Sequence, residues 1–194
     1  MPLSELIAVP SCWRCNDKFA RDDELLRDVL VSATLHVDMP ELAAPRAAMT
    51  RSLARKQFAG PIKRMIGRKT RTYAPLGGSP VLQPAWALPV DRARLERVLQ
   101  RIVRGLFFHE TGRRIPSDYL ITAADQNLVN SAPTYDRPFF ANIIASALEG
   151  EQRAVGGRRF GYCYRVLRDD PLGSVWLLSF LGQLVFLCTA CRRP

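Results

Sequence analysis

The segment from residue 90 to residue 114 constrains the fold most, because it has the periodicity of a long amphipathic helix. It reads VDRARLERVLQRIVRGLFFHETGRR, with Asp91 placed to cap the helix and Gly112 placed to end it. Its apolar residues recur at i, i+3 and i+4, and they are Leu95, Val98, Leu99, Ile102, Val103, Leu106 and Phe107. Such a stripe is stable only when another element covers it. The opposite face carries Arg94, Arg97, Arg101 and Arg104, which we interpret as a solvated polar face.

Shorter patterns on both sides of this helix supply its packing partners. We expect helices over residues 22–36, where Asp22 or Asp23 would be the cap, over 38–60 and over 138–150. The Gly- and Pro-rich stretch 68–90 predicts a hairpin, and residues 118–122 predict a strand. The tail 158–188 predicts three antiparallel strands with turns at Asp169-Asp170-Pro171 and Leu181-Gly182-Gln183. The predicted fold class is α+β, with helices packed on a small antiparallel sheet.

Residues 172–190 are apolar enough that a membrane tail anchor must be weighed against strands. Gly173, Ser174, Ser179, Gly182 and Gln183 dilute the run, and Trp176, Leu178 and Phe180 alternate as on one face of a strand. We favour the strands. The five cysteines are an odd set, and no charged segment followed by an apolar one opens the chain. Both observations favour a cytoplasmic protein over a secreted disulfide framework.

The net charge of +10 is concentrated in one segment. Residues 42–90 contain no Asp or Glu, and their nine basic residues are Arg46, Arg51, Arg55, Lys56, Lys63, Arg64, Arg68, Lys69 and Arg71. A local positive field attracts DNA or RNA, an acidic protein or an anionic membrane surface, although it is also found on plain solvated faces. A second, weaker sign of base stacking is the alternation of Phe160, Tyr162 and Tyr164 among arginines, which is more often one packed face of a strand.

Cys12 and Cys15 have the CxxC spacing that lets one turn direct two sulfurs at one cation. A structural Zn²⁺ takes four ligands, and a second pair, Cys188 and Cys191, follows a hydrophobic strand near the end of the sequence. We interpret that second pair as core or incidental thiols. Zn²⁺ is therefore a cofactor hypothesis that depends on Cys12 and Cys15.

The stretch VPSCWRCNDKFARDDELLRDVL, residues 9–30, resembles the second half of the zinc-binding head of HNH-nuclease-like proteins. It is also similar to a group of uncharacterised bacterial proteins, which have counterparts of VRGLFFHETGRRIP and SVWLLSFLGQLVF as well. The resemblance implies a treble-clef or zinc-knuckle remnant over residues 1–38, followed by an α+β body over 39–194. It implies zinc ligands at Cys12 and Cys15 and a supporting role for Asn16.

The resemblance carries no catalytic histidine onto this sequence. In such nucleases a His activates water beside a divalent cation, and here no His or Cys precedes Cys12. Either the encoded protein is longer or the first half-site has been lost, so the sequence leaves an enzymatic activity undecided. His109 and Glu110 are an adjacent pair that could bind a metal or act as a base, while a structural role at a helix end is favoured.

Two hypotheses of function follow from these patterns. The first is a nucleic-acid-associated protein related to HNH-like nucleases, in which the basic segment contacts phosphates and which is catalytically inactive if the first half-site has been lost. The second is a non-enzymatic protein that binds an acidic partner or a membrane surface through the same segment and the hydrophobic tail.

Overall fold

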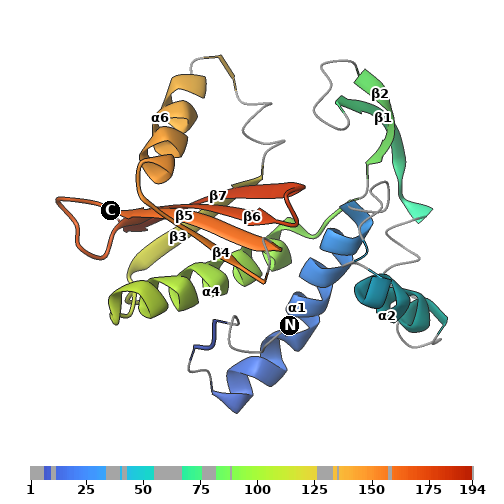
Figure 1. Ribbon diagram of the computed structural model, residues 1–194, viewed down its shortest axis with the longest axis horizontal. Helices are drawn as coiled ribbons and strands as arrows, with labels where there is room; N and C mark the ends of the chain where they lie inside the picture. The colour runs from blue at the N-terminus through green and yellow to red at the C-terminus, as the bar shows by residue number, and fades with distance from the viewer. Residues whose placement is uncertain are drawn as a thin grey trace. The chain divides into compact units, whose positions relative to one another are not determined.

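The computed structural model describes residues 7–9, 12–33, 40, 43–54, 67–75, 82–87, 89–125, 133–134, 136–156 and 159–193. The chain divides into two compact units (Figure 1), of which one combines Met1–Glu24 with Ala93–Pro194 and the other is Leu25–Arg92. Each unit is described by itself. The boundary that the resemblance implies after residue 38 stays a prediction.

The larger unit contains a five-stranded antiparallel sheet, which confirms the α+β class. The strand order is β3-β7-β6-β5-β4, and the strands are β3 (Tyr119–Asp125), β4 (Glu151–Val155), β5 (Phe160–Val166), β6 (Ser174–Phe180) and β7 (Leu184–Arg192). Strands β5, β6 and β7 are the three antiparallel strands predicted for the tail. Within residues 172–190, positions 174–180 and 184–190 thus belong to strands of this sheet. No helix in the described parts of the chain is long and apolar enough to cross a bilayer.

The two tail turns form where they were predicted. Leu181 and Gly182 join β6 to β7 with φ angles of 55° and 65°, and the Gln183 N–H donates to the Phe180 carbonyl at 3.0 Å. Positive φ at both central residues defines a type I′ turn, whose twist matches that of the strands it connects. Between β5 and β6, the Gly173 N–H donates to the Asp170 carbonyl at 2.9 Å.

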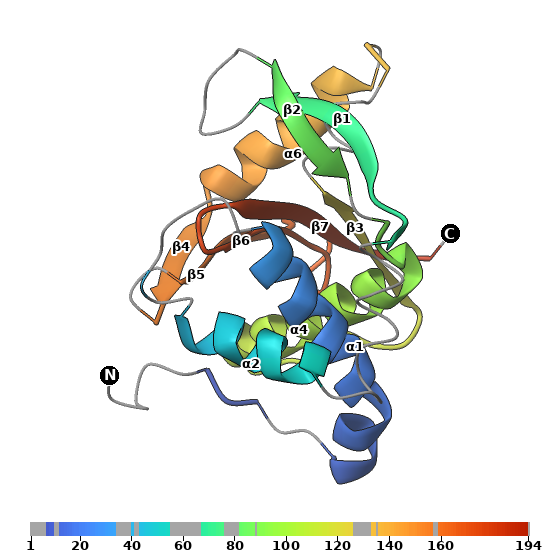
Figure 2. The same ribbon diagram turned by 90° about the vertical axis from the view of Figure 1, so that its right-hand side faces the viewer.

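Helix α4 (Arg92–Thr111) covers one face of this sheet, and α6 (Arg137–Leu148) lies on the other side (Figures 1 and 2). The predicted stripe of α4 is its buried face, with Leu95, Val98, Leu99, Val103, Leu106 and Phe107 in the core. Gly112 ends the helix at φ 68°, as expected for a C-terminal glycine. After α6 the chain passes so close to β5 that a Cβ at Gly150 would lie 2.0 Å from the Tyr164 carbonyl oxygen.

Helix α1 (Trp13–Ala33) begins nine residues before the predicted start at residue 22. Asp22 and Asp23 were predicted as caps, but they lie inside the helix and bind arginines of α4. Asp22 is 6% exposed and accepts hydrogen bonds from Arg94 Nε at 2.7 Å and Arg97 Nε at 3.0 Å. Asp23 pairs with Arg101, whose guanidinium also lies 4.5 Å from the centre of the Phe19 ring.

The arginines of α4 therefore do not form the solvated face that we expected. Besides the three that bind α1, Arg104 donates to the carbonyls of Ile115, Pro116 and Tyr119 at 2.6, 3.1 and 3.3 Å. It thereby holds the segment between α4 and β3. Burial lowers the pKa of this guanidinium, which remains the donor in all three bonds.

The smaller unit contains α2 (Ala43–Ala54) and the predicted hairpin. Pro45 is the third residue of α2, where a proline costs no intrahelical hydrogen bond. Strands β1 (Thr70–Pro75) and β2 (Leu82–Ala87) pair antiparallel as a two-stranded ribbon, with Arg71 opposite Trp86 and Tyr73 opposite Pro84.

Candidate functional site

The CxxC segment is the start of α1 rather than a separate turn. Cys12 directly precedes the helix and is exposed, and Cys15 lies in the first helical turn. The N–H of Asn16 donates to the Cys12 carbonyl at 3.0 Å, which is the i to i−4 bond of a helix. Asn16 is exposed on this first turn.

The described residues do not complete a zinc site around these cysteines. Across the described ranges, no group of three or more His, Cys, Asp or Glu side chains could hold a metal ion. Cys188 is fully buried in β7, and burial raises the pKa of its thiol to about 12. A buried thiol that keeps its proton is a poor metal ligand, in agreement with its interpretation as a core residue. Cys191 is exposed near the end of the same strand.

His109 and Glu110 lie in the last turn of α4 but are not directed to one site. His109 is exposed, whereas the Glu110 side chain is only 9% exposed. Glu110 accepts hydrogen bonds from the hydroxyls of Tyr162 and Tyr164 at 2.5 and 3.0 Å, and its Oε1 lies 3.7 Å from Arg153 Nε. Burial and the bond to Glu110 raise the pKa of both tyrosines, that of Tyr164 to about 12.

A structural role is enough to explain the Glu110 cluster, which consists of Glu110, Tyr162, Tyr164 and Arg153. Glu110 joins the end of α4 to β5 through two phenols and to β4 through Arg153. The rings behind it are packed: Tyr164 stacks on Trp176 with centroids 4.8 Å apart and planes at 14°. The alternating aromatics of β5, which we weighed as a base-stacking surface, thus belong to the packed face of the sheet.

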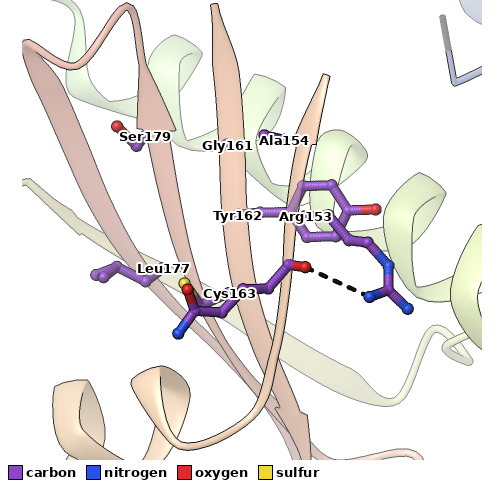
Figure 3. A pocket seen from close by; sticks show the side chains of 8 residues that line it. Arg153, Ala154, Gly161, Tyr162, Cys163, Leu177 and Ser179 are labelled. Carbon is purple, nitrogen blue, oxygen red and sulfur yellow. Dashed lines mark hydrogen bonds between the residues drawn. The ribbon is translucent and has the colours of Figure 1, made fainter. Parts of the chain in front are cut away.

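A shallow depression of about 280 Å³ lies on β4, β5 and β6 (Figure 3). Arg153 and Tyr162 point to one side of the strands, while Cys163 and Leu177 point to the other. Its lining is completed by Gln152, Ala154, Gly161 and Ser179. Burial raises the pKa of the Cys163 thiol, which disfavours the reactive thiolate. The residues that line this depression include no carboxylate and no histidine.

Five of the nine predicted nucleic-acid-binding residues lie in the described part of the chain. Arg46 and Arg51 are on α2, with Arg51 exposed, while Arg68, Lys69 and Arg71 are exposed at and before β1. The other four, Arg55, Lys56, Lys63 and Arg64, lie outside the described residues. The described basic residues therefore come from α2, from β1 and from the two positions directly before β1.

Sequence reasoning missed Tyr73, which lies on β1 with 64% of its surface exposed. Side chains two positions apart in a strand share a face, so Tyr73 lies on the same face of the ribbon as Arg71. Its cross-strand neighbour Pro84 is exposed as well. We call Arg68, Lys69, Arg71 and Tyr73 the basic ribbon. The alternation in RTY, residues 71–73, places Arg71 and Tyr73 on one face of a predicted strand. Whether that face is exposed can be judged only once the pairing with β2 is known.

No family model matches this chain, and no curated protein or solved structure matches it.

Proposed function

We propose that this protein binds nucleic acid through the basic ribbon and the adjoining basic segment. The observation that carries the proposal is the concentration of nine basic residues without any acidic residue over positions 42–90. Arg68, Lys69 and Arg71 are exposed, so they can approach phosphates without breaking the packing of a core. Exposed Lys and Arg that neutralise phosphates release counterions, and this release supplies most of non-specific affinity.

Two further considerations support nucleic acid over other anionic partners. The resemblance of residues 9–30 to HNH-nuclease-like proteins favours the same class of partner. An exposed aromatic beside the basic side chains adds a surface for bases, which an acidic protein or a lipid headgroup does not offer. An acidic protein partner is the competing proposal, because the same charges would attract it.

The proposal does not include hydrolysis of the nucleic acid. Cys12 and Cys15 would supply two donors where structural zinc takes four, and across the described residues no group of three or more His, Cys, Asp or Glu side chains could hold a metal ion. The proposal therefore includes no metal, and Glu110 is engaged by two tyrosines and an arginine. Descent from an HNH-like nuclease remains a hypothesis about origin, and the nucleic-acid proposal does not depend on it.

Binding measured against salt tests the proposal. Fluorescence anisotropy with labelled 20-nucleotide DNA and RNA should give an affinity that falls linearly on a log–log plot against salt concentration. The double variant Arg68→Glu/Arg71→Glu should bind about tenfold or more weakly at low salt, with a slope shallower by about 1.5. The matched control is Arg113→Glu/Arg114→Glu, which reverses two exposed arginines in the other unit and should change affinity little.

Three results would contradict the proposal. The first is no binding at low salt or an affinity that does not respond to salt. The second is an equal loss of affinity in the control variant, which would mean that overall charge alone is responsible. The third is that poly-glutamate competes as effectively as unlabelled oligonucleotide when both are added at the same total negative charge. That result would favour the acidic partner.

A further inference from the structure

The face of the basic ribbon combines a cation with a flat ring. Arg71 and Tyr73 are two positions apart in β1 and so lie about 7 Å apart along one face of the strand. Arg68 and Lys69 extend the positive charge along the approach to the strand. Tyr73 is 64% exposed, although burial of a tyrosine ring on a β-ribbon is favourable. A large ring left in water beside arginines is suited to contact with a ligand that has both phosphates and flat apolar faces.

Resting on the proposed function, we infer that the basic ribbon prefers single-stranded nucleic acid to duplex, with Tyr73 stacking on an unpaired base and Arg68 and Arg71 on the flanking phosphates. In a duplex the faces of the bases are covered by their neighbours, so Tyr73 could reach only the edges and the backbone. In a single strand each base has an open face, and stacking on an aromatic side chain stabilises the complex without sequence preference.

The alternative for a two-stranded ribbon is insertion into the major groove of a duplex, which is wide enough to admit one. Direct reading of base edges there uses side chains that make two hydrogen bonds to one base, such as Arg, Asn and Gln. On the described face of this ribbon Arg71 is such a residue, but its neighbour on the same face is the ring of Tyr73, and across from that ring stands the apolar Pro84. This pair is better suited to stacking than to reading edges.

Three probes of the same length separate stacking from phosphate contact. They are a labelled mixed-sequence 20-nucleotide strand, the duplex formed with its complement, and an abasic strand of the same length. The duplex carries about twice the charge of the other two, so phosphate contact alone would favour the duplex. The wild-type protein should bind the single strand at least about fivefold more tightly than either the duplex or the abasic strand. Tyr73→Ala should lose this advantage and bind the single strand about as weakly as the abasic one.

Control variants distinguish a failure of this inference from a failure of the proposed function. Tyr73→Phe keeps the ring and should retain the preference, and Phe139→Ala removes another aromatic residue, 63% exposed in the other unit, and should do the same. Circular dichroism should show the same melting temperature for Tyr73→Ala and wild type.

Two results would show that the inference is wrong while the proposed function stands. The first is that Arg68→Glu/Arg71→Glu weakens binding to all three probes while Tyr73→Ala weakens binding to none. The second is that the duplex binds as tightly as the single strand. Absence of salt-dependent binding to every probe overturns both.

Discussion

Leu181 is the one non-glycine residue at positive φ in the described chain, and it stands at the first central position of the β6–β7 turn. Its φ of 55° places the Cβ of an L-residue close to the following carbonyl. The turn type requires this conformation at both central positions, and asparagine adopts it at lower cost than leucine. Leu181 thus adopts the φ that the hairpin turn requires, although leucine favours negative φ.

We therefore expect Leu181→Asn to stabilise the protein by about 0.5–1 kcal/mol, because the strain is relieved while the turn is kept. Urea denaturation followed by tryptophan fluorescence measures the free energy of unfolding. The control is Gln183→Asn, which also introduces an asparagine but places it just after the two positive-φ positions of the turn. It should change stability little. A loss of stability in Leu181→Asn would show that contacts of the half-buried leucine side chain outweigh the strain.

At the scale of elements, one buried carboxylate, that of Asp22, joins α1 to two arginines of α4. Burial alone would raise the pKa of Asp22, but hydrogen bonds from Arg97 and Arg94 outweigh it, so the pKa lies below the usual value for aspartate. The ionised form is thus favoured in the folded protein. The two arginines are partly exposed, with 31% and 46% of their side chains accessible, which reduces the strength of each pair.

We predict that Asp22→Asn destabilises the protein by about 1–2 kcal/mol near neutral pH, whereas Asp23→Asn, at the more exposed neighbour, costs less than about 0.5 kcal/mol. Because the folded pKa of Asp22 is depressed, its contribution is present above about pH 4 and is lost as the pH falls through the folded pKa. Urea denaturation should therefore show a smaller difference in free energy of unfolding between wild type and Asp22→Asn at about pH 3 than at about pH 7. An equal difference at both pH values would mean that Asp22 stabilises the protein through packing rather than charge.

The elements that could be predicted from the sequence are those with a strong local period. The stripe of α4 and the alternation in β6 identify their structures because each pattern repeats within the element itself. The start of α1 was missed because Asp22 and Asp23 resemble caps, and only their pairing with residues of α4 shows that they lie inside a helix. Arg94 binds a partner 72 positions away in sequence, and no local pattern contains that information.

At the scale of the whole molecule, the same limit applies to the candidate sites. The basic segment is visible as composition, but the exposure of Tyr73 depends on the hairpin register, and that register is set by pairing with β2. Glu110 was a candidate beside His109, yet strand pairing of β4 with β5 brings Arg153 and Tyr162 to it. The sequence thus indicates which residue types are present, while tertiary packing decides which of them remain available to a partner.

The Glu110 cluster also gives the whole molecule a defined response to alkaline pH. Tyr164 has a folded pKa of about 12, raised first by burial and then by its bond to Glu110, and burial and the same carboxylate raise the pKa of Tyr162 further. An unfolded tyrosine ionises near pH 10. Between these values the unfolded chain has released the proton and the folded protein has kept it, so stability falls as the pH rises.

We predict that the free energy of unfolding declines between about pH 10 and about pH 12 by up to about 1.4 kcal/mol per pH unit for each of the two tyrosines, less where solvent reaches the ring. Tyr164→Phe removes one ionisable group, so its decline should be shallower by up to about 1.4 kcal/mol per pH unit. The variant starts about 1 kcal/mol less stable because a bond to Glu110 is lost. Tyr73→Phe removes an exposed tyrosine and should follow the wild-type curve. Denaturant titrations across this range measure the slopes. Equal slopes for wild type and Tyr164→Phe would show that the alkaline response comes from elsewhere, and the carboxylate–phenol cluster would then be a packing feature without a role in pH dependence.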